Sequence, residues 1–161
     1  MISLKLPLAI VLLMSGTLVL PSNAHDGPED YLIPHAEARK AVGLKPLIWD
    51  KKLEAYAKDY TSQRIGDCEL VHSEGPYGEN LAWCSDDLSV ADAVKMWTDE
   101  GADYDYNTNN CCEGKECGHY KQVVWRDTTC IGCAKVRCNN GGTLISCNYD
   151  PPGNYEGQKP Y

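Results

Sequence analysis

Histidine and carboxylate side chains that could perform acid–base or metal chemistry stand beside apolar segments of this 161-residue chain. His119 precedes the apolar run 123–125. A histidine next to buried apolar residues usually makes a hydrogen bond, binds a metal or transfers a proton. Each of these tasks needs partners, so the elements that pack against His119 decide its chemistry.

One candidate partner lies on a predicted helix. The pattern over 29–42 is typical of a helix that ends at Gly43, with Pro34 in its first turn. On a helical period His35 shares an apolar face with Val42. A core histidine with satisfied hydrogen bonds is the commoner outcome at such a position.

Two carboxylates are further candidates. A helix is predicted to begin after Ser89 and to end at Gly101, and Glu100 falls on its buried side, three residues after Trp97. A carboxylate there must be paired or hydrogen-bonded, because burying an unpaired charge is too costly. Glu79 precedes an apolar strand, and taken alone it is best interpreted as a surface carboxylate.

The hairpin predicted over 131–150 has a turn at 139–142 that allows two registers. A two-residue turn would put Cys147 opposite Ala134, whereas a three-residue loop would put Cys147 opposite Cys133. Only the second register permits a cross-strand disulfide without backbone strain. We therefore expect the three-residue loop. One more helix is predicted over 51–65, capped by Asp50.

The N-terminal segment 1–24 has the composition of a secretory signal, with cleavage expected after Ala24. The alternative is a membrane anchor, but the apolar run is short and interrupted. Residues 25–161 then form a single domain. The last residues, 151–161, show no periodicity and are expected to form an extended C-terminal arm.

Acidic residues outnumber basic residues by 23 to 15, which gives a formal net charge of −8. Such a surface repels nucleic acid and anionic membranes at long range. We therefore expect no nucleic-acid partner, and the short, interrupted apolar run at the N-terminus leads us to expect no transmembrane anchor.

The chain has nine cysteines, all of which follow the predicted signal segment. In an exported protein this composition indicates a disulfide framework, and the odd number leaves at least one thiol. A zinc–thiolate site at 130–133 with Cys138 is the alternative. The paired spacing does not occur a second time, however, and the compartment is oxidising.

Three long motifs occur in order along the chain, at 77–82 (YGENLA), 118–125 (GHYKQVVW) and 147–155 (CNYDPPGNY). With them the chain resembles the plant class-one pathogenesis-related proteins. These belong to the CAP superfamily, which also includes cysteine-rich secretory proteins and antigen 5. The resemblance covers the whole of 25–161 and implies an α+β fold, a three-layer α-β-α sandwich with a small antiparallel sheet. It also implies a short helix after Gly118, where the β-branched run would favour a strand.

The family has a central cleft lined by two histidines and two glutamates, which the resemblance assigns to His35, Glu79, Glu100 and His119. It also implies that His35 and His119 bind a divalent metal such as zinc, although no cofactor is required. The alternative is a hydrogen-bond and ion-pair network that only ties the helices to the sheet.

The resemblance implies disulfide pairing as well, and the pairs are Cys68–Cys138, Cys111–Cys117 and Cys133–Cys147. Three cysteines depart from the family's usual six, namely Cys84, Cys112 and Cys130. Two of these could pair with each other, or one could form an intermolecular bond, and Cys112 could compete for Cys117.

The resemblance implies a secreted, extracellular (apoplastic) defence protein that binds a sterol or similar lipid, acts against microbes and is not an enzyme. A first alternative is a precursor whose C-terminal peptide 151–161 is released by cleavage between Asp150 and Pro151 and recognised by a receptor. A second alternative is a metal-dependent hydrolase, with the cleft histidines and glutamates as acid–base groups.

Overall fold

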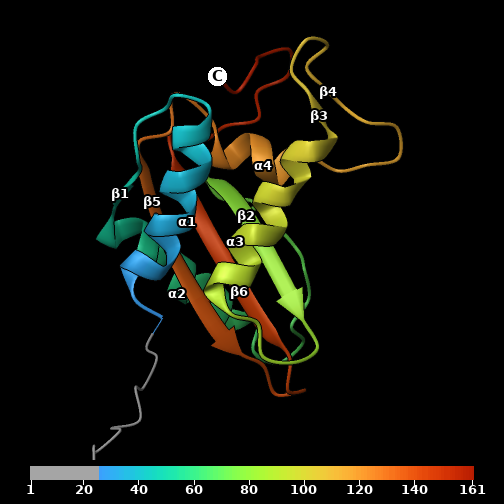
Figure 1. The fold of residues 1–161 in the computed structure, drawn as a ribbon. Helices are drawn as coiled ribbons and strands as arrows, with labels where there is room; N and C mark the ends of the chain where they lie inside the picture. The colour runs from blue at the N-terminus through green and yellow to red at the C-terminus, as the bar shows by residue number, and fades with distance from the viewer. Residues whose placement is uncertain (1–25) are drawn as a thin grey trace, which may run out of the picture.

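The computed structural model describes residues 26–161, so the predicted signal segment 1–24 and its cleavage point lie outside the described residues. A four-stranded sheet lies between two helical layers (Figure 1). The helical elements are α1 (Pro28–Ala41), α2 (Lys51–Gln63), α3 (Val90–Asp99), the 3₁₀ turn η1 (Glu100–Asp103) and α4 (Gly118–Val123). The strands are β1 (Ile48–Trp49), β2 (Gly78–Cys84), β3 (Tyr104–Asp105), β4 (Asn110–Cys111), β5 (Cys130–Arg137) and β6 (Thr143–Asp150).

The sheet has the strand order β1-β5-β6-β2. Strands β5, β6 and β2 pair antiparallel, and the two-residue β1 adds a parallel edge to β5. Cys133 lies opposite Cys147, as the three-residue loop predicts. The N–H of Cys138 donates to the carbonyl of Gly142 at 2.8 Å, and Gly141 has a φ of +87° inside the loop. The predicted register is therefore confirmed.

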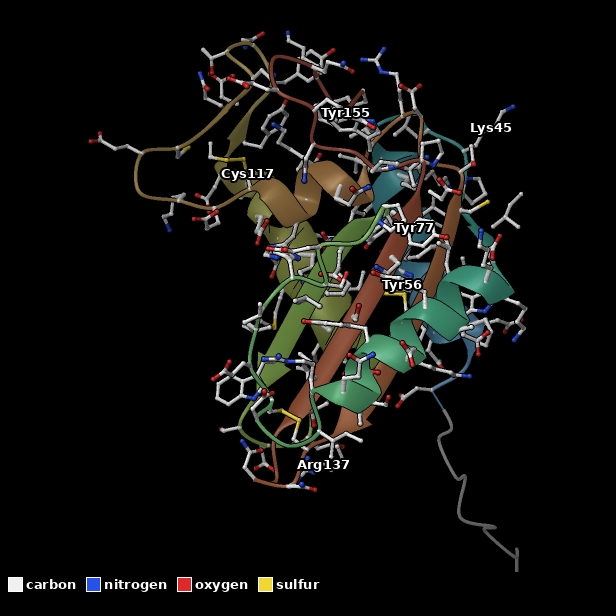
Figure 2. All side chains as sticks on the ribbon, turned by 180° about the vertical axis from the view of Figure 1, so that it is seen from behind. Lys45, Tyr56, Tyr77, Cys117, Arg137 and Tyr155 are labelled. Carbon is white, nitrogen blue, oxygen red and sulfur yellow. A yellow bond between two sulfur atoms is a disulfide. The ribbon has the colours of Figure 1, made fainter. Side chains whose placement is uncertain are left out.

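Helix α2 covers one face of the sheet, and α1, α3 and α4 cover the other (Figures 1 and 2). Gly132 on β5 faces α2 at very close range, because a Cβ atom there would overlap the backbone of Leu53 and Glu54. The absence of a side chain at this position lets the helix lie directly on the strand. On the opposite face, alternate residues of β5 and β6 such as Ile131 and Ile145 are fully buried in the main apolar core.

The helix caps follow the sequence signals, with one correction. Asp50 accepts hydrogen bonds from the N–H groups of Lys52 (2.6 Å) and Leu53 (3.2 Å) at the start of α2. Helix α1 begins at Pro28, one residue before the predicted start, and Pro34 lies inside the helix and not in its first turn. The first-turn prediction for Pro34 is wrong because Pro28 already occupies the favoured position.

The segment after Gly118 is a helix, as the family resemblance implies and the β-branched run does not. Gln122 and Val123 point inward and are buried. Lys121 lies on another side of the helix, with its ammonium 5.9 Å from the ring centroid of Tyr104. Burial of the apolar side of α4 against the core outweighs the local preference for a strand.

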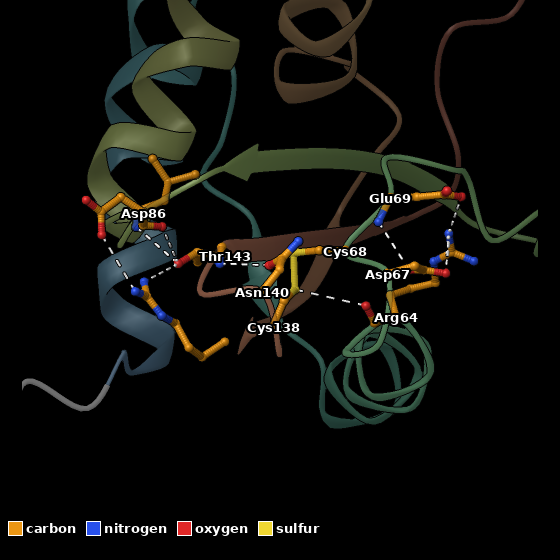
Figure 3. Close-up of a disulfide and its surroundings, with 11 residues drawn as sticks. Arg64, Asp67, Cys68, Glu69, Asp86, Cys138, Asn140 and Thr143 are labelled. Carbon is orange, nitrogen blue, oxygen red and sulfur yellow. Dashed lines mark hydrogen bonds and ion pairs between the residues drawn. A yellow bond between two sulfur atoms is a disulfide. The ribbon is translucent and has the colours of Figure 1, made fainter.

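The structure contains the three disulfides Cys68–Cys138, Cys111–Cys117 and Cys133–Cys147, the same pairs that the family resemblance implies. Figure 3 shows how Cys68–Cys138 joins the segment after α2 to the tip of the β5–β6 hairpin. The remaining cysteines are Cys84, Cys112 and Cys130.

Two of these free cysteines lie at opposite ends of the sheet. Cys84 is level with Thr143 at the start of β6, and Cys130 is level with Asp150 at its end. The length of β6 separates them by roughly 20 Å. A Cys84–Cys130 disulfide within one chain is therefore excluded by geometry.

The C-terminal arm 151–161 has no helix or strand and lies across α4 and the β3–β4 hairpin (Figure 1). Its N-terminal part is held by the side-chain oxygen of Gln122, which accepts from the N–H of Gly153 at 2.9 Å. Its end is held by the Tyr161 ring, which stacks on Tyr106 at a centroid distance of 4.9 Å. Within residues 26–161, no helix has the length and apolar character needed to cross a membrane.

Candidate functional site: a cleft with two histidine–glutamate pairs

A polar cleft of about 180 Å³ lies where the loop before β2, the start of α4 and the C-terminal arm meet. Its walls are polar or charged, and they bring together segments that are far apart in the sequence. The lining residues are His72, Glu79, Asn80, Glu116, Gly118, His119 and Asn154.

The first histidine–glutamate pair joins η1 to α4. Nδ1 of His119 lies 2.6 Å from Oε1 of Glu100. The other oxygen of this carboxylate accepts from the backbone N–H groups of His119 (3.0 Å) and Tyr120 (3.2 Å). Glu100 therefore satisfies the free N–H groups at the start of α4 while it orients the imidazole.

The orientation of His119 is also fixed by packing. Its ring stacks on the indole of Trp97 at a centroid distance of 6.3 Å and an interplanar angle of 21°. The side chain remains 35 % exposed, so one edge of the imidazole faces the cleft. The sequence-based expectation that Glu100 is a buried, partnered carboxylate describes this arrangement.

The second pair joins the loop before β2 to the strand itself. Nδ1 of His72 lies 2.7 Å from Oε1 of Glu79, which also accepts from the N–H of Ser73 at 2.9 Å. The Glu79 side chain is only 5 % exposed, whereas the His72 side chain is 63 % exposed. Glu79 is therefore not the surface carboxylate that its local sequence suggests.

The segment that carries His72 is positioned by aromatic contacts with α2. The hydroxyl of Tyr56 donates to Oγ of Ser73 at 3.2 Å. The Tyr56 ring also packs edge-on against Tyr77, with centroids 5.2 Å apart, and the two residues are labelled beside each other in Figure 2. The loop is thus anchored on both sides of its turn, which keeps His72 beside Glu79.

His35 does not lie in the cleft, and its assignment to the cleft and to a metal is wrong. It is fully buried, with Nδ1 2.7 Å from the carbonyl of Tyr31 and Nε2 2.9 Å from the hydroxyl of Tyr149. A carbonyl can only accept, so we assign the proton to Nδ1. Burial lowers the pKa of His35 to about 4, and the ring is therefore neutral near pH 7.

A buried polar chain connects His35 to the cleft. Tyr149 donates its hydroxyl proton to Nε2 of His35 and accepts from the amide of Asn80 at 3.2 Å. The same amide donates to the backbone carbonyl of His119 at 3.1 Å. His35 thus supports the cleft from behind, through two residues that the sequence analysis did not single out.

The arrangement of ligands does not form a complete metal site. In the part of the chain that the structure describes, no three His, Cys, Asp or Glu side chains gather in a group that could hold a metal ion. The pair His35 and His119 cannot share an ion, because both ring nitrogens of His35 are hydrogen-bonded in the core.

The two cleft histidines resemble zinc ligands in one respect. Both hold Nδ1 against a glutamate, which is how carboxylates orient zinc-binding imidazoles. His72 and His119 would be the residues to hold such an ion through Nε2, where it would act as a Lewis acid. Two imidazoles alone are an incomplete ligand set, and we assign no reaction step to a metal here.

A second, less polar groove lies between α1 and α3, the two helices at the front of the view in Figure 1. Its volume is about 430 Å³, within the range of roughly 300–1,000 Å³ that is typical of small-molecule sites. Small side chains and a tyrosine form most of its surface. The lining residues are Pro34, Glu37, Ala38, Ala41, Ala91, Lys95, Thr98 and Tyr120.

Comparison with known proteins gives a consistent family. Residues 32–149 match the model of the CAP domain, described as the cysteine-rich secretory protein family. The chain is 58 % identical over 154 residues to a pathogenesis-related protein 1 of Arabidopsis thaliana, covering 96 % of this chain and 94 % of that protein. It is 57 % identical over 144 residues to the basic form of pathogenesis-related protein 1 of Nicotiana tabacum, covering 89 % and 81 %.

Solved structures agree on the fold. Venom allergen-like protein 4 of Schistosoma mansoni superimposes with a TM-score of 0.65 and 30 % identity, covering 81 % of this chain and 90 % of that one. The structure titled NaASP2 with Zn²⁺ superimposes with a TM-score of 0.71 and 25 % identity, covering 88 % of each chain.

Proposed function

This chain belongs to the cysteine-rich secretory protein (CAP) family, and from that premise we propose that it is a secreted plant defence protein that binds a sterol or similar lipid. Its high identity to pathogenesis-related proteins of plants supports the defence role. We propose binding rather than catalysis, because lipid capture needs shape and apolar area, not a reactive group.

The groove between α1 and α3 is the observation that carries this proposal. Alanines from both helices form its floor, and Ala38, Ala41 and Ala91 leave room that larger side chains would fill. Tyr120 of α4 also lines the groove. A flat, rigid, apolar molecule such as a sterol fits a floor of this kind, because contact with small side chains removes apolar surface from water.

Polar groups at the groove edge offer partners for a sterol hydroxyl. Thr98 carries a hydroxyl, and Glu37 is an exposed carboxylate on the other wall. Lys95 is held by Asp99, with its ammonium 2.7 and 2.6 Å from the two carboxylate oxygens. A ligand with one polar end and an apolar body is therefore favoured over a fully apolar one.

Three features support secretion. The N-terminal segment has a signal-like composition, three disulfides cross-link the domain, and the relatives are pathogenesis-related proteins. Disulfides persist in oxidising compartments such as the extracellular space. We propose the apoplast as the site of action.

The test is a titration of the oxidised protein with a fluorescent sterol. We expect saturable binding, weakened by about tenfold or more in Ala91→Leu and Ala41→Leu, because the added methyl groups occupy the groove. Ala55→Leu is the matched control, since Ala55 is exposed on α2 in the opposite helical layer. The proposal fails if no saturable binding occurs, or if the groove variants bind as well as the control.

The C-terminal arm supports a second candidate function, as the precursor of a peptide. Asp150 and Pro151 are both exposed where β6 ends and the arm begins, so a protease can reach the bond between them. Incubation with extracellular plant fluid, followed by mass spectrometry, is expected to detect the free peptide 151–161. The control is the denatured protein, which the same fluid should digest completely. If the control is digested but the native protein releases no peptide 151–161, this function is contradicted.

A further inference from the structure

A basic pocket lies away from both the cleft and the α1–α3 groove. It is formed by the connection 43–48 between α1 and β1 and by the turn 126–129 before β5. Its volume is about 330 Å³, again within the small-molecule range of roughly 300–1,000 Å³. Its lining includes the cations Arg39, Lys45 and Arg126, together with apolar groups such as Leu44 and Ile48.

None of the three cations has a counter-ion among the described residues. Six lysine or arginine side chains of residues 26–161 form ion pairs within 4.0 Å, whereas Arg39, Lys45 and Arg126 form none. No carboxylate lines the pocket, even though the whole chain has a net charge of −8. The pocket is therefore a local concentration of positive charge on an acidic protein.

Arg39 is the most unusual of the three, because it is buried and its charge is not neutralised by any described carboxylate. It is 2 % exposed, and its guanidinium donates only to backbone carbonyls. These are the carbonyls of Lys45 at 2.7 Å, Val123 at 3.0 Å, Trp125 at 2.8 Å and Thr128 at 3.0 Å.

The same hydrogen bonds hold the two walls of the pocket in place before any ligand binds. The carbonyls of Lys45 and Thr128 belong to its two opposite walls, and Arg39 ties both walls to α1. Carbonyl oxygens satisfy the N–H groups of Arg39 but leave its net charge in place, and a buried charge is costly without an opposite charge nearby. A bound anion would supply that charge.

We propose that this pocket binds a phosphate monoester with an apolar body. Arg39 provides charge from beneath, and Lys45 and Arg126 are exposed cations at the rim that can contact the phosphate oxygens directly. Figure 2 shows Lys45 projecting outward at the end of the molecule opposite Arg137. Ile48 is 68 % exposed beside these cations, so it offers apolar surface to the carbon skeleton of the ester.

The positive charge of the pocket favours a phosphate monoester over a carboxylate. A phosphate monoester carries close to two negative charges near neutral pH, which suits a site with three unpaired cations. Both soluble esters and phosphatidate headgroups have this chemistry. We favour a soluble ester, because the net negative charge of the chain opposes approach to an anionic membrane.

The experiment is a titration of the isotopically labelled, oxidised secreted protein, followed by backbone amide chemical shifts. The probe is phenyl phosphate, with sodium chloride adjusted to keep the ionic strength constant. We expect saturable shifts confined to 43–48 and 126–129, with a dissociation constant in the millimolar range or below. Vesicles containing phosphatidate form a second arm, and binding to them alone would identify a lipid headgroup as the source of the phosphate.

Variants decide whether the pocket is responsible. Lys45→Ala and Arg126→Ala should each weaken phenyl phosphate binding by about tenfold, whereas Lys45→Arg should retain it. Lys115→Ala is the matched control, because it removes the same charge from an exposed loop far along the chain. Shifts that never saturate, that phenol reproduces, or that persist unchanged in Lys45→Ala would overturn the proposal.

Discussion

Nδ1 of His72 lies 2.7 Å from the carboxylate of Glu79, seven residues further along the chain. The loop between them reverses direction, so an exposed histidine and a buried glutamate become a pair. The same Glu79 carboxylate also serves Ser73 and Asn148, whose amide lies 3.4 Å from Oε2. Glu79 is therefore the centre of this wall of the cleft, and His72 is its outer partner.

Glu79→Ala should lower the free energy of unfolding by about 1–3 kcal/mol, because it leaves the N–H of Ser73 and the amide of Asn148 without their acceptor. His72→Ala should cost less than about 1 kcal/mol, since His72 is largely exposed. Urea denaturation of the oxidised proteins measures both. Glu74→Ala, at an exposed neighbouring carboxylate, is the control. An equal loss of unfolding free energy in Glu79→Ala and Glu74→Ala would show that the hydrogen bonds of Glu79 do not stabilise the fold.

Stability should fall between about pH 6.5 and pH 4 because of His35. Burial lowers its folded-state pKa to about 4, whereas the unfolded value is about 6.5. In this window the unfolded chain binds a proton at His35 that the folded chain does not bind. The stabilising contribution is therefore complete above about pH 6.5 and decreases as the pH falls, by up to about 3 kcal/mol at pH 4.

The measurement is urea denaturation at several pH values for the wild type and His35→Gln, which keeps a polar side chain but does not titrate. The difference in free energy of unfolding between the two proteins should shrink as the pH falls from 6.5. A constant difference across that range would show that His35 keeps an ordinary pKa. Glu54, whose pKa is lowered from 4.5 to about 2 by its bonds to Lys51, Lys58 and Trp49, loses its contribution as the pH falls below 4.5, and it does so equally in both proteins.

A cleft residue could be predicted from the sequence only where helical periodicity places its side chain on a known face. Glu100 could be predicted as a partnered carboxylate because a helical period places it on the side of Trp97. His72 could not, because it lies in an irregular loop where no period relates a side chain to a face. For His35 the apolar face was visible, but its partner, the hydroxyl of Tyr149, is 114 residues away and depends on tertiary packing.

The fold was more predictable than the site. The caps at Asp50 and Ser89 and the hairpin register follow from short-range rules. The two-residue strand β1 and the position of Pro34 inside α1 did not follow from them. Very short strands depend on neighbours supplied by the rest of the sheet, so local sequence carries little information about them.

Sterol binding should be independent of metal. His72, His119 and Glu79 line the cleft but not the α1–α3 groove. An ion in the cleft would therefore not contact the lipid. The sterol dissociation constant should agree within about twofold in zinc and in excess chelator. Loss of binding on chelation, restored by zinc and abolished in His72→Ala, would instead link the cleft to lipid capture.

Removal of the aromatic stack at the chain end should loosen the C-terminal arm. The Tyr106 ring stacks on Tyr161 and also contacts the ammonium of Lys159, which lies 4.3 Å from its ring centroid. Tyr106→Ala should speed carboxypeptidase removal of Tyr161 by roughly fivefold, as expected for losing about 1 kcal/mol of aromatic contact. Mass spectrometry follows the digestion, and Trp83→Ala, at an exposed site on β2, is the control. Identical rates in the two variants would show that the stack does not restrain the arm.

The three disulfides should contribute unequally to stability because they close loops of different length. Cys68–Cys138 spans 70 residues, whereas Cys111–Cys117 spans only 6. In the chain-entropy description, removing the long-range bond with paired serines should cost about 4 kcal/mol, and removing the short-range bond about 2 kcal/mol.

The comparison is made by thermal and urea denaturation of each double-serine variant, with the free thiols counted to verify the remaining pairs. Cys68 and Cys138 are both buried, and their bond joins α2 to the hairpin, so lost packing adds to the entropic cost. Cys111 is exposed on the β3–β4 hairpin, although Cys117 is buried at the start of α4. A larger loss from the Cys111–Cys117 variant than from the Cys68–Cys138 variant would mean that the start of α4, and with it the Glu100–His119 pair, depends on that short bond more than loop entropy predicts.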